Sequence, residues 1–477
     1  MKKTKIICTL GPAVDKPEVL EELIKAGMDV ARINFSHGNY KDQEPRIENF
    51  KKVRAKVGKP VALLLDTKGP EIRIGKFENN GIELKTGDIF TLVSEDVLGN
   101  QEKVSITYKN LYNEVNAGTI ILINDGLIKV VVKEIKGTDI VCEVIDGGKL
   151  TNTKSINIPG MNINLPSPTE KDIEDIKFGI SVGFDYIAAS FVRTPQDVLN
   201  IRKILKENNG ENIKIISKIE NRQGIDNFDE ILEVSDGIMV ARGDLGVEIP
   251  MEEVPVRQKE FIAKCNKAGK PVVIATQMLE SMIENPRPTR AEVSDVANAI
   301  YDMTSCIMLS GEAAVGKYPI ECVKTMVKIA EKIEESIKYW KRFMKKDHDC
   351  NKEDYEYNLN YSTCATAKDL NAKAIFAYTD TGRTAKMLAG FMPQCPIYVI
   401  TSNEKVCKQL SLVWNVNTIV VEKKDKIEEM MKLGIEFAKE HKFIEKDDIV
   451  VIAGGASILS GHEHGGLNKT IGGVLKV

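Results

Sequence analysis

Polar and charged side chains that could do chemistry gather where short apolar runs of this 477-residue chain end. A strand cap or a surface salt bridge would explain any one such group. Six strand ends that carry functional groups at one face of a fold indicate a site instead. The six segments are R-I-N-F-S-H-G (32–38), D-T-K-G-P-E-I-R (66–73), S-K-I-E-N (217–221), A-R-G-D (241–244), A-T-Q (275–277) and S-G-E (310–312).

Two carboxylates in these segments are suited to a metal ion. Lys218 and Glu220 are two residues apart, so on a strand their side chains project on the same side. Asp244 follows the neighbouring predicted strand, close enough to Glu220 to share a divalent cation. Because no His or Cys ligand is near, a hard ion is favoured, and Mg²⁺ fits best since it retains waters and substrate oxygens.

The cations around this pair outnumber its acids, which indicates an anionic substrate with phosphate or carboxylate groups. A structural ion-pair network is the alternative. No serine lies in a G-x-S-x-G elbow, the five His residues form no triad-like arrangement, and no G-x-x-x-x-G-K-[ST] loop is present. Direct phosphoryl transfer, which needs a metal and positioning but no covalent intermediate, is therefore favoured. The cations are Arg32, Arg73, Lys218 and Arg242.

Eight apolar runs, each followed by a helical pattern, predict the elements that position these residues. Each run is short, aliphatic and barely alternating, as parallel strands buried on both faces are. Eight β-α units in series favour an α/β fold, a closed (β/α)8 TIM barrel. Helix signals agree: Pro17 opens a helix that Gly27 closes, and Thr169 with Asp172 predicts a capping box. The runs are Lys5–Thr9, Asp29–Asn34, Val61–Asp66, Tyr186–Phe191, Lys214–Ile219, Gly237–Ala241, Val272–Thr276 and Cys306–Ser310.

Two further segments break the repeat. Residues 70–159 hold Ile/Val runs split by turn signals such as Asp125-Gly126, which predicts a small all-β domain inserted into a βα loop as a lid. Lys341–Asn360 is charged and predicts a linker. The predicted domains are a catalytic barrel (1–69 and 160–340), a lid (70–159) and a C-terminal doubly wound α/β regulatory domain (341–477). Strands of the last domain are expected at Ala374–Thr379, Ile397–Thr401, Thr418–Glu422 and Ile449–Ala453.

Composition excludes several classes of function. A net charge of −3 gives no reason to expect a nucleic-acid or membrane partner. No stretch is long enough to span a bilayer, and the N-terminus lacks the apolar region of a signal peptide. Nine scattered cysteines without C-x-x-C indicate reduced, mostly buried thiols. We therefore expect a cytoplasmic protein.

Long ordered strings in the chain resemble the pyruvate kinase family, over nearly its whole length. The resemblance implies that the chain transfers a phosphoryl group between phosphoenolpyruvate and ADP, giving pyruvate and ATP, with Mg²⁺ (or Mn²⁺) and K⁺. It also implies a homotetramer under allosteric control. The strings are K-T-K-I-I-C-T-L-G-P (3–12), R-I-N-F-S-H-G (32–38), L-L-D-T-K-G-P-E-I-R (64–73), I-S-K-I-E-N (216–221), G-I-M-V-A-R-G-D-L-G-V-E-I-P (237–250), A-T-Q-M-L-E-S-M (275–282) and N-P-R-P-T-R-A-E (285–292).

The family's roles can be carried to matching positions. Glu220 and Asp244 would hold Mg²⁺, which bridges the substrate's carboxylate and phosphate. Lys218 would meet the phosphoryl group in transfer, and Arg32 would bind that group. The lid would close over the site and exclude water.

The resemblance implies further ligands in the same region. Gly243 with Thr276 would bind the carboxylate, and Thr276 would lie where the enolate carbon is protonated. Glu71 matches the residue of K⁺-requiring members, where K⁺-independent ones usually carry Lys. The K⁺ ligands would be Asn34, Ser36, Asp66 and Thr67. The nucleotide would be served by Asn34, His37, Arg73 and Lys154.

In the C-terminal domain, a strand-to-helix loop matches part of the family's sugar-phosphate site. The effector, a sugar phosphate or AMP, is open because the loop 454–465 departs from the family pattern. Met303, Ser305 and Ala313 depart as well, away from the metal and phosphate groups. The effector loop comprises Thr379, Thr381, Gly382, Arg383 and Thr384.

Two other classes remain as alternatives. A barrel lyase or aldolase also binds pyruvate-like acids with Mg²⁺, but it needs no nucleotide, K⁺ ligands or β lid. An inactive sugar-phosphate sensor would be expected to lose Lys218, Glu220, Asp244 or Thr276, and all four are present.

Overall fold

A closed barrel of parallel strands forms the centre of the computed structural model, which describes residues 2–36, 38–161, 163–345, 354–424, 426–454 and 471–477. The strand order around the barrel is β1-β17-β16-β15-β14-β13-β3-β2, so every strand is paired on both sides. All eight predicted runs are confirmed as strands. They are β1 (Lys5–Thr9), β2 (Val30–Asn34), β3 (Ala62–Asp66), β13 (Tyr186–Ala189), β14 (Lys214–Ile219), β15 (Gly237–Ala241), β16 (Val272–Ala275) and β17 (Cys306–Leu309).

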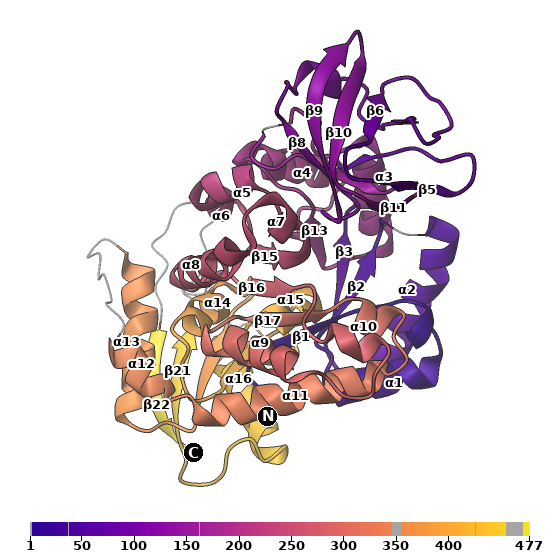
Figure 1. Ribbon diagram of the computed structural model, residues 1–477. Helices are drawn as coiled ribbons and strands as arrows, with labels where there is room; N and C mark the ends of the chain where they lie inside the picture. Colours follow the sequence, from indigo (N-terminus) through magenta and orange to yellow (C-terminus); the bar gives the residue numbers. More distant parts are fainter. Residues whose placement is uncertain (1, 37, 162, 346–353, 425, 455–470) are drawn as a thin grey trace.

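Helices follow the strands and cover the barrel from outside (Figure 1). The predicted capping box is present: the Thr169 side chain accepts from the Asp172 backbone N–H at the start of α3. Pro17 begins α1, and Gly27 ends it with a φ of 134°. The outer helices are α1 (Pro17–Ala26), α2 (Tyr40–Val57), α3 (Glu170–Val182), α4 (Pro195–Glu207), α6 (Phe228–Val234), α8 (Val254–Lys267), α9 (Arg290–Tyr301) and α11 (Pro319–Ser336).

The segment between β3 and α3 folds into β structure of its own, beyond one end of the barrel (Figure 1). A seven-stranded sheet in the order β4-β12-β8-β9-β10-β6-β7 and a β11-β5 pair enclose a separate apolar core. The predicted turn at Gly137 joins β9 to β10. Its strands are β4 (Ile72–Arg73), β5 (Gly81–Leu84), β6 (Ile89–Val93), β7 (Lys103–Ser105), β8 (Ile120–Ile123), β9 (Ile128–Lys136), β10 (Asp139–Asp146), β11 (Gly148–Thr151) and β12 (Ser155–Asn157).

A five-stranded sheet in the order β20-β19-β18-β21-β22 forms the C-terminal unit. Helices cover it, among them α14 (Arg383–Gly390), α15 (Glu404–Gln409) and α16 (Ile427–Glu440). The third expected run begins at Val416, two residues earlier than predicted, and the antiparallel β22 was missed because its Gly472-Gly473 pair weakens the strand pattern. The strands are β18 (Ala374–Tyr378), β19 (Ile397–Thr401), β20 (Val416–Val420), β21 (Ile449–Gly454) and β22 (Ile471–Lys476).

The prediction that residues 341–360 form an exposed linker is wrong. Helix α12 (Tyr339–Lys345) and helix α13 (Tyr355–Asp369) occupy its described ends, and Asn360 is fully buried. Aromatic side chains in this charged segment explain the difference, since Phe343 stacks on Tyr361 with ring centroids 5.3 Å apart.

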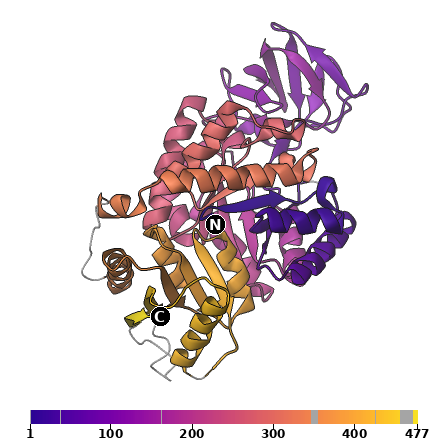
Figure 2. The ribbon, with the colours of Figure 1, turned by 90° about the horizontal axis from the view of Figure 1, so that it is seen from below.

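The C-terminal unit packs against the amino ends of the barrel strands, opposite the lid (Figure 2). The buried Tyr186 hydroxyl, at the start of β13, donates to the Gln409 carbonyl at 2.5 Å. The Asn415 N–H donates to the Lys3 carbonyl at 2.9 Å. The carboxyl ends of the strands therefore face the lid, and the amino ends form a closed floor.

Other sequence expectations can be located in this fold. All eight cysteines in the described ranges are free and buried. Met303 has a φ of 71°, a conformation that favours glycine, so this departure from the family pattern strains the backbone. Ala313 is fully buried and Ser305 is nearly so. Across the described part of the chain, no helix is long and apolar enough to cross a membrane.

Candidate active site

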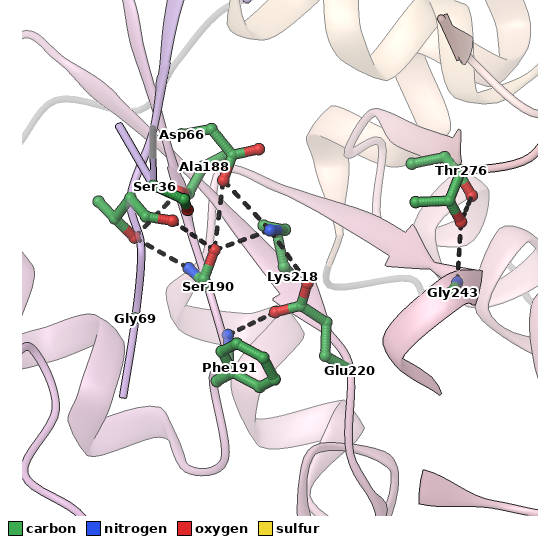
Figure 3. A network of polar contacts seen from close by, with 12 residues as sticks. Ser36, Asp66, Gly69, Ala188, Ser190, Phe191, Lys218, Glu220, Gly243 and Thr276 are labelled. Atoms are coloured by element: carbon green, nitrogen blue, oxygen red, sulfur yellow. Dashed lines mark hydrogen bonds and ion pairs between the residues drawn. The ribbon is translucent and has the colours of Figure 1, made fainter. Parts of the chain in front are cut away.

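The Lys218 ammonium lies at the centre of a polar network at the carboxyl ends of the strands (Figure 3). Its nitrogen is 3.1 Å from Asp66 Oδ1, 2.7 Å from Ser190 Oγ and 3.0 Å from Glu220 Oε1. An ammonium has three N–H donors, so these three partners match its capacity. A phosphoryl oxygen can contact this nitrogen only by sharing or displacing one of them.

The charges in this network shift one another's pKa values. Burial alone would lower the pKa of Lys218, but Asp66 and Glu220 outweigh it and raise that pKa, so the ammonium stays charged. Burial raises the pKa of Glu220 to about 7, against the opposing effect of Lys218, and the nearby Asp244 carboxylate adds to the rise. Burial opposes ionisation of Asp66 too, but Arg32 and Lys218 hold its pKa below the usual value.

Glu220 and Asp244 fit a divalent cation. Glu220 Oε1 is buried, lies 3.0 Å from the Lys218 ammonium, and has no other hydrogen-bond partner among the described residues. Asp244, in the first turn of α7 (Arg242–Glu248), lines the cleft between lid and barrel. The described residues contain no group of three or more His, Cys, Asp or Glu side chains that could hold a metal. An ion here would take its remaining ligands from water and substrate, as Mg²⁺ does.

Arg32 lies beside this network on β2. Its Nε donates to Asp66 Oδ2 at 2.6 Å and its Nη1 donates to Thr9 Oγ1 at 2.7 Å. The side chain is only 8% exposed, so these contacts fix the guanidinium plane. Its remaining N–H groups can still bind an anion at the barrel mouth.

Thr276 and Gly243 form a second contact to one side of the Lys218 network (Figure 3). The Gly243 N–H donates to Thr276 Oγ1 at 2.8 Å. Thr276 has a φ of 69°, and β16 ends one residue before it, where the backbone turns into the barrel mouth. Strained backbone of this kind persists where the surroundings hold it, often at functional sites.

The expectation that Arg242 is a substrate-facing cation is wrong in this structure. Its Nη1 donates to Asp295 at 2.8 Å, and its Nη2 donates to the Thr276 carbonyl at 2.7 Å. Arg242 therefore supports the strained Thr276 backbone, and the charge of its guanidinium is matched by Asp295.

Two residues of the network were missed by sequence reasoning, Ser190 and Phe191. Besides accepting from Lys218, Ser190 Oγ is 2.7 Å from the Thr67 carbonyl. The Phe191 N–H donates to Glu220 Oε2 at 2.6 Å, and Phe191 itself has a φ of 54°. Both residues follow β13 directly, so the strand-end argument applied to the other strands would have found them.

The residues expected to bind K⁺ lie together at the ends of β2 and β3. Asn34 pairs with Asp66 in the strand register, and the Ser36 N–H donates to Asn34 Oδ1 at 3.0 Å. Thr67 Oγ1 accepts the Ser190 N–H at 3.1 Å. Both Asp66 oxygens already accept from cationic groups, so a K⁺ ion would share this carboxylate with Arg32 and Lys218.

The expected nucleotide residues lie at the junction of lid and barrel. Arg73 Nε donates to Glu71 at 2.8 Å, and its Nη1 donates to the Thr153 carbonyl at 2.7 Å. The neighbouring Lys154 carbonyl accepts from the Ile74 N–H at 2.9 Å, which brings Lys154 beside Arg73. His37 lies outside the described residues.

The expected effector loop connects β18 to α14. Thr379 Oγ1 accepts the Gly382 N–H at 3.0 Å, and Gly382 has a φ of 80°. Arg383 binds Glu356 on α13 through Nε at 2.9 Å and Nη2 at 2.6 Å. Thr381 is exposed and Thr384 is buried. The 454–465 loop, with His462 and His464, falls outside the described residues except for Gly454.

Comparison with known proteins gives matches over both main parts of the chain. A family model described as "Pyruvate kinase, barrel domain" matches residues 1–323, and one described as "Pyruvate kinase, alpha/beta domain" matches residues 358–468. A pyruvate kinase of Clostridium acetobutylicum is 50% identical, covering 95% of this chain and 96% of the relative. One of Sporosarcina psychrophila is 50% identical over 96% of this chain and 78% of the relative, and one of Clostridium perfringens is 48% identical over 95% and 96%.

Proposed function

The chain belongs to the pyruvate kinase family, a family of phosphotransferases, and from this premise we propose that it transfers the phosphoryl group of phosphoenolpyruvate to ADP with Mg²⁺ (or Mn²⁺) and K⁺ as cofactors. The observation that carries the proposal is the Lys218 ammonium, buried between Asp66 and Glu220 with Asp244 close by. We assign catalysis to the barrel (1–69 and 160–340), closure to the lid (70–159) and regulation to residues 341–477.

In this reaction, each residue would either stabilise the charge of the substrate or hold the substrate in position. A bound divalent cation would supply a positive charge for the substrate's phosphate and carboxylate oxygens. Lys218 and Arg32 would neutralise the phosphoryl group as it leaves the enolate oxygen, in a site from which the lid excludes water. The Gly243 N–H and Thr276 hydroxyl would bind the carboxylate. Thr276 would also stand near the carbon that gains a proton.

Potassium and the nucleotide would occupy the other side of Lys218. Oxygens of Asn34, Ser36, Asp66 and Thr67 suit a monovalent cation, since only one of the four side chains carries a charge. The nucleotide would extend toward Asn34, His37, Arg73 and Lys154. Glu71, which holds Arg73, would make the enzyme dependent on K⁺.

Regulation would reside in the C-terminal domain of a cytoplasmic homotetramer. A sugar phosphate or AMP would bind the loop formed by Thr379, Thr381, Gly382, Arg383 and Thr384. Arg383 is held by Glu356, so an anionic effector would compete with that carboxylate for the guanidinium.

A direct test is ATP formation from phosphoenolpyruvate and ADP, with Mg²⁺ and K⁺ present, followed through a coupled reaction. We expect ATP and pyruvate in equal amounts and neither product when ADP is omitted. A barrel lyase or aldolase would form no ATP, and that result would overturn the proposal. Rates with single sugar phosphates or AMP added would then identify the effector.

A further inference from the structure

A single polar contact joins the lid to the helix that carries Asp244. Asn157, the last residue of β12, donates from Nδ2 to Glu248 Oε1 at 2.8 Å, and Glu248 is the last residue of α7. In the described ranges this is the one hydrogen bond between residues 72–158 and α7, and no ion pair joins these two parts; the hydrogen bonds of Glu114 and Tyr108 with Asn164 reach only the segment that returns from the lid to the barrel. Elsewhere the two units are joined by the chain segments that enter and leave the lid.

The position of Glu248 ties this contact to the reaction site. Asp244 and Glu248 are four residues apart on α7, so they lie one above the other on one face of the helix. Both line the cleft between lid and barrel, together with Asn157 and Asn221. A movement of the lid that pulls on Glu248 therefore acts on the turn that holds Asp244.

A close approach of the lid backbone to α7 supports the same arrangement. The β8–β9 turn of the lid rests over α7, where a Cβ atom placed on Gly126 would lie 3.7 Å from the Val247 side chain. Val247 and Glu248 are adjacent, so the last turn of α7 meets the lid through both residues. The lid thus forms a hydrogen bond with α7 at Glu248 and comes close to it at Val247.

The chemistry of the pair suits a contact that opens and closes. A lysine or arginine at position 157 would bind Glu248 more strongly, but its charge would lie in the cleft and could also attract Asp244 or an anionic substrate. A neutral amide donates one hydrogen bond to the carboxylate without adding charge. The amide therefore favours the closed position of the lid and does not change the net charge of the site.

We propose that Asn157 and Glu248 form a lid latch: they are positioning residues whose hydrogen bond holds the lid closed over the barrel mouth and keeps α7, with Asp244, in place. The inference deepens the proposed function and rests on it for its effect on turnover. The latch itself is a statement about lid position, which can be measured without substrate.

The test exchanges the chemical groups of the pair. Asn157→Asp sets two carboxylates against each other, and we expect kcat/KM for phosphoenolpyruvate to fall by roughly tenfold or more, as for loss of a charge-assisted hydrogen bond. Glu248→Gln retains an acceptor for the Asn157 amide, so its effect should stay within about threefold. The double variant N157D/E248Q restores a donor and an acceptor and should recover most of the loss.

The distance between the lid and the barrel is a second measurement, and substitution of a residue with only a structural role would not change it. Fluorophores on cysteines introduced at two exposed positions, Lys136 in the lid and Lys203 on α4, report the distance between the two units by energy transfer. N157D should lengthen that distance, and N157D/E248Q should shorten it again. Asn113→Asp, the same substitution at an exposed lid position, should change neither distance nor kcat/KM.

Several outcomes would overturn the latch. An unchanged distance in N157D would do so, as would a double variant that stays as open as N157D. If N157D does not fold, Asn157→Ala, which removes the amide without adding charge, should open the lid in its place, and a closed lid in that variant would refute the idea. Absence of ATP formation by the unaltered protein would refute the proposed function alone, because the distance measurement needs no reaction.

Discussion

Replacing Lys218 by Met removes the ammonium on which the proposed chemistry depends while retaining a side chain of similar length. The change leaves Asp66 with Arg32 as its one cationic partner and leaves Glu220 with none among the described contacts. With that ammonium gone, burial and Asp244 are opposed mainly by the Phe191 N–H, so the pKa of Glu220 should rise from about 7. Glu220 would then be largely protonated at neutral pH.

Two magnitudes follow from this geometry. Loss of a donor aimed at transition-state charge lowers turnover by roughly a hundred- to a thousandfold, which is about 3–4 kcal/mol. Removal of one partner from a buried ion pair destabilises a fold by about 3–5 kcal/mol. Because Arg32 still pairs with Asp66 and Glu220 can take up a proton, we expect a destabilisation at the lower end of that range.

The assay is ATP formation at saturating phosphoenolpyruvate and ADP, with the free energy of unfolding measured on the same samples by urea titration. Lys214→Met is the matched control, since Lys214 lies on the same strand at the floor of the barrel, 3.9 Å from Asp236. It should retain turnover within about threefold, because Lys214 lies at the opposite end of the strand from the site and Asp236 keeps Arg202 as a partner. Near-normal turnover of a folded Lys218→Met protein would refute the assigned role.

Four further substitutions test other parts of the proposal. Glu71→Lys should relieve the need for K⁺, measured as turnover with and without KCl, and a variant still inactive without K⁺ would count against the assignment. Ser190→Ala should lower turnover by roughly tenfold, since it removes one of three partners that orient the Lys218 ammonium; an unchanged rate would show that the other two suffice. Thr381→Ala and Arg383→Ala should blunt activation by sugar phosphates or AMP and spare the maximal rate, and activation that survives both would place the effector elsewhere.

The barrel also explains why the site tolerates such a dense set of charges. Lys218 and Asp66 lie on strands of the closed barrel and Glu220 directly follows one, so the backbone holds these three side chains together. The C-terminal unit seals the floor with contacts such as Tyr186 to Gln409. The Lys218 network lies at the opposite end, which faces the lid.

The amino-acid sequence was sufficient to predict the barrel strands and the residues that lie at their carboxyl ends. A parallel strand buried on both faces must be a short aliphatic run, and functional groups of a barrel lie where such runs end, so Lys218, Glu220, Asp244 and Thr276 could be recognised from their neighbours alone. Turn signals of the Asp125-Gly126 type likewise identified the inserted β domain, because these residues adopt the backbone angles that tight turns require. These are local properties of the chain.

The tertiary structure decided which of those groups share a contact. Lys218 and Asp66 are 152 residues apart in the sequence. They meet because only β13 separates their strands, β14 and β3, in the closed barrel. Arg242 was expected to face the substrate, but it finds Asp295, a partner 53 residues away that no local pattern indicates. The pairing of Asn157 with Glu248 likewise depends on where the lid comes to rest. Charged groups on different elements pair according to their distance in the folded chain, and sequence spacing gives that distance only within one strand or helix, as for Lys218 and Glu220.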